Sequence, residues 1–168
     1  MPEWHSIVRA TMPDRIRSPL PPEKPRILID TREQRPWVFS GEVETEVCSL
    51  PTADYSLAGF TDRVCVERKS LDDLVQSLTW ERERFLNACQ RMEAYTFRAL
   101  IAECSLDDIL AHRFRSKARP SSIVGSLVAL GVDHGLPTIF AGSPEMAAQL
   151  CERLLTRIWR KAREASNA

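Results

Sequence analysis

The sequence predicts an α/β domain in which a central mixed β-sheet is flanked by helices. Short apolar runs of strand length alternate with stretches whose apolar residues recur at helical intervals, a pattern typical of this class. The 168 residues are 43% hydrophobic, enough for the core of one domain plus a tail. No internal repeat is visible, so we expect a single domain over residues 26–168.

A proline-rich stretch precedes this domain. Residues 1–25 contain six prolines and several arginines, a composition that disfavours both helix and central strand. We therefore expect a flexible or extended arm, although Trp4, Ile7 and Val8 could dock on the domain.

The first half of the domain is expected to supply four strands. Residues 26–30 form an apolar run suited to a buried strand, and residues 44–50 alternate as a half-exposed strand does. Two further strands, over residues 55–60 and 63–69, are separated by a gap of hairpin length.

The second half is expected to be mostly helical. Ser70 and Asp73 have the spacing of a capping box, and apolar residues at helical intervals follow. The other expected elements are helices over residues 80–95, 106–112 and 120–130, strands over 97–102 and 137–141, and a last helix from Ser143.

Charge and cysteine content exclude some classes of protein. Lys and Arg (23) balance Asp and Glu (23), so DNA binding would need a local basic surface. The five cysteines form no CxxC pair and have no zinc-like spacing to histidine, which favours reduced buried thiols. No stretch has the length and apolarity of a membrane helix or a signal peptide, so we expect a soluble intracellular protein without membrane contact.

Three polar residues at strand ends carry the chemical interpretation. Glu67 and Lys69 share one face of their strand and Arg68 points to the other, while Asp54 lies a short hairpin upstream. Two acids and an ammonium in this arrangement can hold a divalent cation beside a water, which is a way to cut phosphodiesters. Mg²⁺ fits the oxygen ligands, and Mn²⁺ is expected to substitute. The alternative is a set of ordinary charged residues on the surface.

Three segments together carry a further signal: Ile29-Asp30-Thr31-Arg32-Glu33, Ala53-Asp54-Tyr55 and Glu67-Arg68-Lys69-Ser70-Leu71-Asp72-Asp73. They resemble the signature of the XPF-type nucleases, which have the PD-(D/E)xK nuclease fold. The resemblance implies a restriction-endonuclease-like core from about Ile27 to the final helix. One departure is Ala53, where the family has glycine; if this position needs a positive φ, alanine is strained there.

The resemblance also assigns roles to residues of the site. It implies that Asp54, Glu67 and Asp30 bind metal, that Lys69 orients water or offsets charge on the phosphate, and that Arg32 and Glu33 line the same site. Asp30 could instead cap a loop, and Arg32 and Glu33 could simply form an ion pair.

Two residues of the signature are expected to support the site. Arg68 points away from Glu67 and is assigned to buried pairing or to sheet–helix support. Asp73 is also the third residue of the helix capped by Ser70, so a structural role is favoured for it.

Basic residues beyond the signature are candidates for phosphate contact. Arg82 and Arg84 match basic residues that follow the motif in the family, and Gln90 matches a glutamine there. Arg113, Arg115, Lys117 and Arg119 are interpreted as a loop that touches the DNA backbone. A solvated face is the alternative for both groups, and the C-terminal arginines are assigned to an ordinary polar face.

By resemblance, the chain would be a metal-dependent endonuclease that cuts branched DNA (flaps, forks or junctions) in repair or recombination. The alternatives are an inactive DNA-binding or dimerising module of the same fold, and a nuclease of this fold with another DNA substrate. The 168 residues leave no room for the helix-hairpin-helix domain of many relatives, which another chain could supply. We expect a cytoplasmic protein in a prokaryote or virus and a nuclear one in a eukaryote.

The last helix is expected to join two nuclease domains. Its apolar residues form two adjacent stripes, one more than a contact with a single sheet needs. With the family's habit of pairing, this predicts a homodimer or heterodimer with Leu155 or Trp159 at the interface. Met146, Leu150 and Ile158 belong to the same face.

Overall fold

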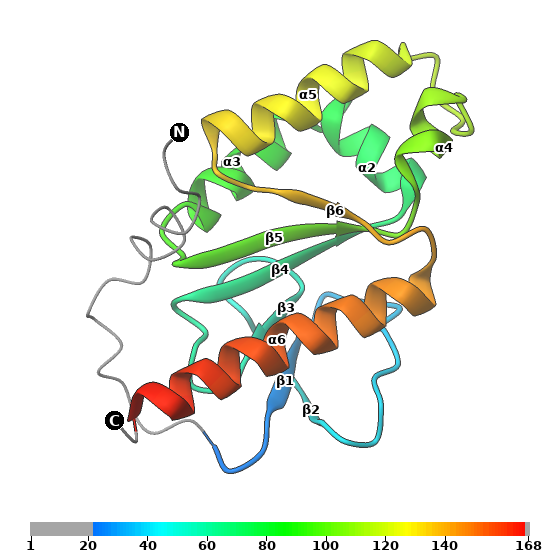
Figure 1. Cartoon of the computed structure of the whole chain (residues 1–168). Coiled ribbons are helices and arrows are strands. Elements are labelled where there is room, and N and C mark those ends of the chain that lie inside the picture. The colour runs from blue at the N-terminus through cyan, green and yellow to red at the C-terminus, as the bar shows by residue number, and fades with distance from the viewer. Residues whose placement is uncertain (1–21, 167–168) are drawn as a thin grey trace, which may run out of the picture.

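One mixed sheet lies at the centre of residues 22–166, the part of the chain that the computed structural model describes (Figure 1). The order of strands across the sheet is β2-β1-β3-β4-β5-β6. Strand β3 is antiparallel to both of its neighbours, and the other pairs are parallel. The strands are β1 (Arg26–Asp30), β2 (Glu44–Cys48), β3 (Tyr55–Leu57), β4 (Val64–Lys69), β5 (Phe97–Ala102) and β6 (Thr138–Phe140). The predicted α/β fold with a mixed sheet is confirmed.

Helices cover both faces of the sheet, and they are divided unequally. One face carries α2 (Leu71–Leu78), α3 (Arg82–Met92), α4 (Leu106–Leu110) and α5 (Pro120–Asp133). The other face carries the long α6 (Pro144–Ser166), which runs below β4 and β5 in the view of Figure 1. The helices therefore lie close to their predicted positions.

Two hydrophobic cores result from this arrangement. Because neighbouring residues of a strand point to opposite faces, Leu100 and Ile101 of β5 belong to different cores. Leu100 packs with Leu74 and Phe85 on the side of α2 and α3, whereas Ile101 packs with Leu155 of α6. The site described below lies at the ends of the strands between these cores.

Helix α6 uses one of its two apolar stripes for its own domain. Ala147, Cys151 and Leu155 are fully buried against the sheet. The prediction that Leu155 contacts a partner chain is therefore wrong, because this side chain is buried in the core of its own domain. Trp159 packs beside the same core and donates a hydrogen bond from Nε1 to the carbonyl of Pro22 at 2.8 Å.

The predicted arm is described only at its end, since residues 1–21 lie outside the described residues. In residues 22–25 the carbonyl of Glu23 accepts a hydrogen bond from Arg163 at 2.8 Å, and that of Pro25 accepts one from the backbone N–H of Glu44 at 3.1 Å. These residues therefore lie against α6 and β2.

Strand β2 forms one edge of the sheet and is mostly exposed. Arg26 of the neighbouring β1 bridges Glu44 at 2.9 Å and Glu46 at 3.2 Å. This open edge therefore carries acidic side chains that are only partly neutralised.

The structure also bears on the state of the cysteines and on membrane-spanning helices. All five cysteines are free, and four of them are buried, as predicted. Across residues 22–166, no helix is both long and apolar enough to cross a membrane.

Candidate active site

Asp54 is held at the end of the strands by a tight turn and by backbone hydrogen bonds. The preceding Ala53 has a φ of 62°. The backbone strain expected if alanine replaces glycine at a position of positive φ is therefore present. The carbonyl of Asp54 accepts a hydrogen bond from Asp30 N–H at 2.8 Å, and its own N–H donates to the carbonyl of Val66 at 3.1 Å. Its carboxylate Oδ2 also accepts a hydrogen bond from the N–H of Arg68 at 2.8 Å. Both the backbone and the side chain of Asp54 are thus fixed to neighbouring strands.

Glu67 and Lys69 stand together at the end of β4, as their alternation predicts. The ammonium of Lys69 lies 2.7 Å from Glu67 Oε1 and 5.3 Å from the centre of the Phe85 ring. Both side chains are largely buried. They therefore project toward α3, whereas Arg68 points to the opposite face.

Asp54, Glu67 and Lys69 line a cavity of about 240 Å³. One wall is the sheet, and the other is formed by the end of α2 and one side of α3. The other residues in contact with the cavity are Arg32, Thr52, Ala53, Ser77, Glu81, Arg84, Phe85, Ala88 and Arg91.

The electrostatics of the cavity favour a cation. Burial and the nearby negative charge of Glu67 raise the pKa of Asp54 from 3.8 to about 7, although Arg68 N–H and Lys69 oppose the shift. Burial alone would lower the pKa of Lys69, but the carboxylates of Glu67 and Asp54 raise it, so this ammonium stays charged. Lys69 contacts Glu67, which leaves Asp54 without a cation at ion-pair distance among the described residues.

The donor set fits a hard divalent cation. Asp54 Oδ1 and Glu67 Oε2 accept no hydrogen bond within the described part of the chain, and the buried Thr52 Oγ1 beside them also has no partner. Mg²⁺ binds to one or two carboxylates and keeps several waters, so two carboxylates on a small polar cavity suit it. Within residues 22–166, no cluster of three or more acidic, histidine or cysteine side chains gathers as a metal site.

Asp30 does not line this cavity, although it was predicted as a third metal ligand. Its Oδ1 accepts hydrogen bonds from Arg32 N–H and Nε, at 2.9 and 2.5 Å, and its Oδ2 accepts one from Leu50 N–H at 2.7 Å. These bonds outweigh burial and lower the pKa of Asp30. The alternative interpretation, a carboxylate that caps a loop, matches this geometry.

Arg32 extends from that loop to the mouth of the cavity, and its side chain is 67% exposed. It pairs with Asp30 rather than with Glu33. A second cavity, of about 590 Å³, adjoins the first and shares Arg32, Asp54 and Lys69 with it. Glu33 lines only this second cavity.

Arg68 is the centre of a buried ion-pair network, as predicted. Its guanidinium lies 3.0 Å from Glu33 Oε1 and 2.7 Å from Glu103 Oε1, and it also bonds the carbonyl of Arg35. Glu103 accepts a further hydrogen bond from Trp37 Nε1 at 2.6 Å. The network joins β4 and β5 to the segment after β1.

Asp73 acts in the cap of α2. Its backbone N–H donates to Ser70 Oγ at 3.3 Å, and Ser70 Oγ donates to Asp73 Oδ2 at 2.6 Å. The structural role favoured from the sequence agrees with this geometry, and the side chain also borders the second cavity.

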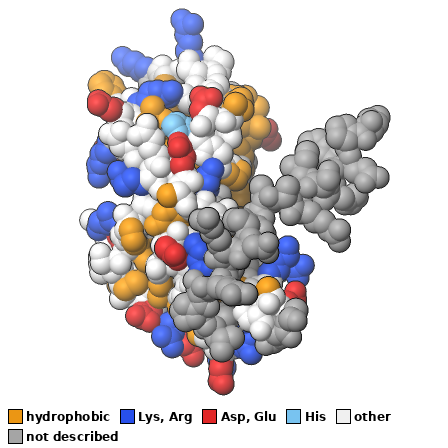
Figure 2. Space-filling view, turned by 90° about the vertical axis from the view of Figure 1, so that its left-hand side faces the viewer, with side chains coloured by type: hydrophobic (Ala, Val, Ile, Leu, Met, Phe, Trp, Pro, Cys, Tyr) orange, Lys and Arg blue, Asp and Glu red, His pale blue; other side chains and the backbone are white. Residues whose placement is uncertain are grey.

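The basic residues predicted to contact DNA divide into three groups. Arg84 lines the first cavity, whereas Arg82 turns away and donates to Ser126 Oγ at 3.0 Å. The four basic residues between His112 and Pro120 are all exposed, and Phe114 between them is buried. Arg115 in this stretch contacts Asp72 at the start of α2. Figure 2 shows basic and acidic side chains interspersed over one face of the protein, in keeping with a net charge of zero.

Sequence reasoning missed several residues at the cavity, among them Arg91 and Ser77, and Trp80 beside it. Arg91 follows Arg84 and Ala88 on the same side of α3, a spacing that the helix period could have revealed. Ser77 reaches the cavity from α2. Trp80 is 87% exposed in the turn between these helices, next to the cavity residue Glu81. Nothing in the sequence pattern distinguishes it from a core aromatic residue.

Comparison with known proteins identifies the family of this chain. The ERCC4 domain family matches residues 29–154. The DNA repair protein rad16 of Schizosaccharomyces pombe is 39% identical over 77 residues, 44% of this chain and 8% of that protein. The 3'-flap repair endonuclease Xpf of Saccharolobus solfataricus is 30% identical over 106 residues, 62% of this chain and 42% of that protein. The matched region thus spans less than half the length of either relative.

Two solved structures have the same fold. XPF from Aeropyrum pernix superposes with a TM-score of 0.64 at 27% identity, over 79% of this chain and 60% of that one. XPF from the same organism in complex with DNA gives a TM-score of 0.63 at 26% identity, over 82% and 66% of the two chains. The match of the family to three quarters of the sequence, the shared fold and the strand-end acids lead to one conclusion: the chain belongs to the ERCC4 domain family, with the nuclease domain of the XPF type.

Proposed function

We propose that this protein is a metal-dependent endonuclease that hydrolyses phosphodiesters in branched DNA during repair or recombination. The observation that carries the proposal is the cavity where Asp54 and Glu67 face each other beside Lys69. Support comes from the relatives: one is named a 3'-flap repair endonuclease, another a DNA repair protein, and an XPF structure contains DNA.

Asp54 and Glu67 would hold the metal ion, and water and phosphate oxygens would complete its shell. Bound Mg²⁺ or Mn²⁺ would act as a Lewis acid and lower the pKa of a bound water. Asp54 and Glu67 are presented by neighbouring strands whose hydrogen bonds fix them before substrate arrives. The ammonium of Lys69 would orient the attacking water or offset negative charge that develops on the phosphate.

Basic residues around the cavity would position the DNA backbone. Arg32, Arg84 and Arg91 line the cavity and would contact the phosphates next to the scissile one. The exposed Arg113, Arg115, Lys117 and Arg119 lie past the end of β4 and would extend this contact. Such contacts are independent of sequence and strongly dependent on salt.

Trp80 would provide a stacking surface for a base. The indole of Trp80 is 87% exposed, and contact of such a large apolar surface with water is unfavourable. A base that is exposed at a branch point would cover it by stacking. Replacement by Phe should keep most of the binding of branched DNA and replacement by Ala should lose it. Equal binding by both variants would contradict this role.

Pairing with a second nuclease domain, identical or different, is part of the proposal. Leu155 is buried, so the surface would use other residues of the predicted face, such as the 44% exposed Met146. Helix α5 offers a second apolar surface with Val128 (61% exposed) and Val132 (77%). Met146→Asp and Val132→Asp, compared by sedimentation at micromolar concentration, would identify the surface. A monomer that cuts branched DNA would contradict pairing.

Cleavage assays on a flap, a fork, a Holliday junction and a linear duplex test the main proposal. We expect cleavage of branched substrates with Mg²⁺ or Mn²⁺, loss with Ca²⁺, which holds looser geometry, and none in EDTA. Cleavage that persists in EDTA would contradict metal catalysis. Binding without cleavage in any metal would favour the inactive module, and equal cleavage of linear duplex would favour another DNA substrate.

A further inference from the structure

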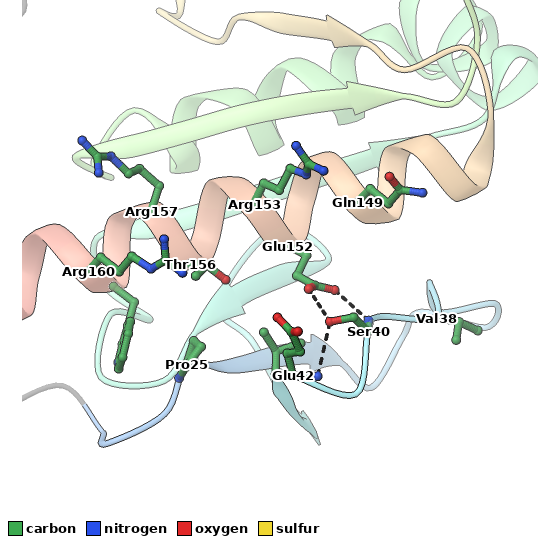
Figure 3. A pocket seen from close by; sticks show the side chains of 12 residues that line it. Pro25, Val38, Ser40, Glu42, Gln149, Glu152, Arg153, Thr156, Arg157 and Arg160 are labelled. Atoms are coloured by element: carbon green, nitrogen blue, oxygen red, sulfur yellow. Dashed lines mark hydrogen bonds between the residues drawn. The ribbon is translucent and has the colours of Figure 1, made fainter.

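A groove of about 660 Å³ lies on the opposite side of the sheet from Asp54, between α6 and the segment around residues 38–43 (Figure 3). Arg153, Arg157 and Arg160 are among the residues of α6 that border it. The family signature does not include these residues, and the sequence assigned them to an ordinary polar face. No step of the proposed chemistry uses this groove.

The three arginines form a row of like charge. They follow one another at i, i+4 and i+7, so they share one side of the helix. All three are exposed, and none makes an ion pair or hydrogen bond with a residue of the 22–166 region. Figure 3 shows Arg153 and Arg157 on the side of α6 turned away from Ser40. Like charges at this spacing destabilise a helix slightly, and a bound anion would remove that cost.

The acidic residues of the groove do not neutralise this row. Glu152 turns toward the facing segment, where its carboxylate accepts hydrogen bonds from Ser40 N–H at 2.7 Å and from Ser40 Oγ at 2.5 Å (Figure 3). It therefore fastens the segment to α6. Glu42 belongs to the facing segment and not to the helix. An anion would consequently bind along the arginines of α6.

The groove is connected to the active site through shared walls. Val38, Ser40 and Gln149 border both this groove and a neighbouring one of about 580 Å³. That neighbour in turn shares Arg35 and Arg68 with the second cavity at the active site. Adjoining cavities thus lead from Asp54 over the strand ends to the groove beside α6.

The geometry points to a second DNA-binding surface: Arg153, Arg157 and Arg160 bind the sugar-phosphate backbone of the strand that leaves the active site. Seven helical residues span about 10 Å, and three phosphate steps of one strand of B-DNA cover about the same length. The contact is electrostatic and reads no base. It rests on the proposed function, because DNA must reach the active site for its strand to follow this path.

The test compares DNA binding of the wild-type protein and the triple variant Arg153→Gln/Arg157→Gln/Arg160→Gln. Affinity is measured in EDTA by fluorescence anisotropy over a series of salt concentrations, with branched DNA of two lengths. For long arms we expect a loss of about tenfold or more at low salt, and a salt slope lower by about 2 to 3. DNA whose arm ends at the branch is too short to reach these arginines, so it should bind the wild-type protein and the triple variant equally.

Single substitutions supply the matched control. Lys161 neighbours Arg160 but lines a different cavity, so Lys161→Gln removes the same charge from another side of α6. It should change the affinity for long DNA by less than Arg160→Gln does, and Arg160→Lys should keep most of the wild-type affinity. Equal losses from Lys161→Gln and Arg160→Gln, or unchanged binding by the triple variant, would overturn the inference.

Cleavage is scored separately in Mg²⁺ under single-turnover conditions at saturating enzyme. The triple variant should retain the wild-type rate once the DNA is bound. If the wild-type protein binds long DNA through these arginines but cleaves no DNA, the result contradicts the proposed function and leaves the second surface standing. A protein that cleaves branched DNA, with the triple variant binding normally, would contradict only the second surface.

Discussion

Two charged clusters on opposite faces of the sheet contain the same balance of charge but differ in how it is paired. Lys69 stands with Asp54 and Glu67 on the α3 side, and Arg68 stands with Glu33 and Glu103 on the other. In each cluster one cation faces two carboxylates. Arg68 contacts both of its acids directly, at 3.0 and 2.7 Å, whereas Lys69 forms an ion pair with Glu67 and none with Asp54 within the described residues.

The difference shows how adjacent residues of β4 serve separate purposes. The planar guanidinium of Arg68 reaches two carboxylates at once, so its network is complete without any ligand. The ammonium of Lys69 contacts Glu67, and within residues 22–166 no cation lies at ion-pair distance from Asp54. Burial and the charge of Glu67 therefore raise the pKa of Asp54. The incomplete cluster is therefore the one suited to bind an ion from solution.

The largest expected effect comes from removing a carboxylate of the incomplete cluster. Asp54→Asn and Glu67→Gln should each lower cleavage at least about 100-fold, roughly 2.7 kcal/mol of barrier, because the proposed metal ion would lose a ligand. Glu33→Gln makes the same chemical change in the complete cluster and should lower the rate less than about tenfold. Single-turnover cleavage measures all three. An Asp54→Asn protein within tenfold of wild type would disprove the assignment of this residue as a ligand.

Breaking the complete cluster should instead affect stability. Arg68→Met leaves Glu33 and Glu103 without their shared cation and should lower the free energy of unfolding by about 3–5 kcal/mol. Lys69→Met should cost clearly less stability while abolishing cleavage, since Lys69 has one acid partner and faces a polar cavity. Urea denaturation followed by circular dichroism separates the two. Equal destabilisation by both substitutions would show that the clusters do not differ as described.

The pH dependence of the metal-free protein provides a third test of the comparison. Folding raises the pKa of Asp54 from 3.8 to about 7, so the folded state holds this proton more tightly than the unfolded state. This stabilisation is fully present below about pH 4 and is lost as pH rises to about 7. At about 1.4 kcal/mol per pH unit, the loss approaches about 4 kcal/mol.

Asp54→Asn cannot lose this proton and should remove that part of the pH dependence. Denaturation in EDTA at pH 5, 6, 7 and 8 compares the variant with the wild type, and titratable groups remote from Asp54 contribute equally to both curves. We expect the variant to gain stability relative to the wild type as pH rises. Parallel curves would mean that the carboxyl of Asp54 is ionised throughout.

The smallest expected effect concerns the turn that presents Asp54. Ala53→Gly should relieve the positive φ, a gain of about 1–2 kcal/mol, but it removes a buried methyl group worth about 0.8 kcal/mol. A net stabilisation of up to about 1 kcal/mol is expected, with unchanged cleavage. Thermal denaturation measures the gain, and Ala53→Val, which is bulkier at the same φ, should be destabilised. A less stable Ala53→Gly would mean that packing outweighs strain.

Much of the fold was predictable because its signals are local. The period of apolar residues predicted the strands and helices, and the spacing of Ser70 and Asp73 predicted the helix cap. The alternation of side chains along β4 predicted that Glu67 and Lys69 would point to one face of the sheet and Arg68 to the other. Each inference needed only neighbouring residues.

The features that the sequence did not predict depend on distant contacts. Asp30 is engaged by Leu50 N–H, which lies 20 residues away, and no local pattern distinguishes such a capped carboxylate from a metal ligand. Leu155 belongs to an apolar stripe wide enough for two contacts, and only the packed sheet reveals which stripe is buried. The groove beside α6 forms where Ser40 contacts Glu152, which lies 112 residues later in the sequence.

The acidic rim of β2 limits how copies of this domain can assemble. Two such edges placed side by side would bring Glu44 and Glu46 of both chains into proximity, with one Arg26 per chain to offset them. Like-charge repulsion therefore opposes extension of the sheet from one molecule into the next at this edge. Any association between two copies of this domain is therefore favoured through their helices or through the opposite edge strand β6, rather than through β2.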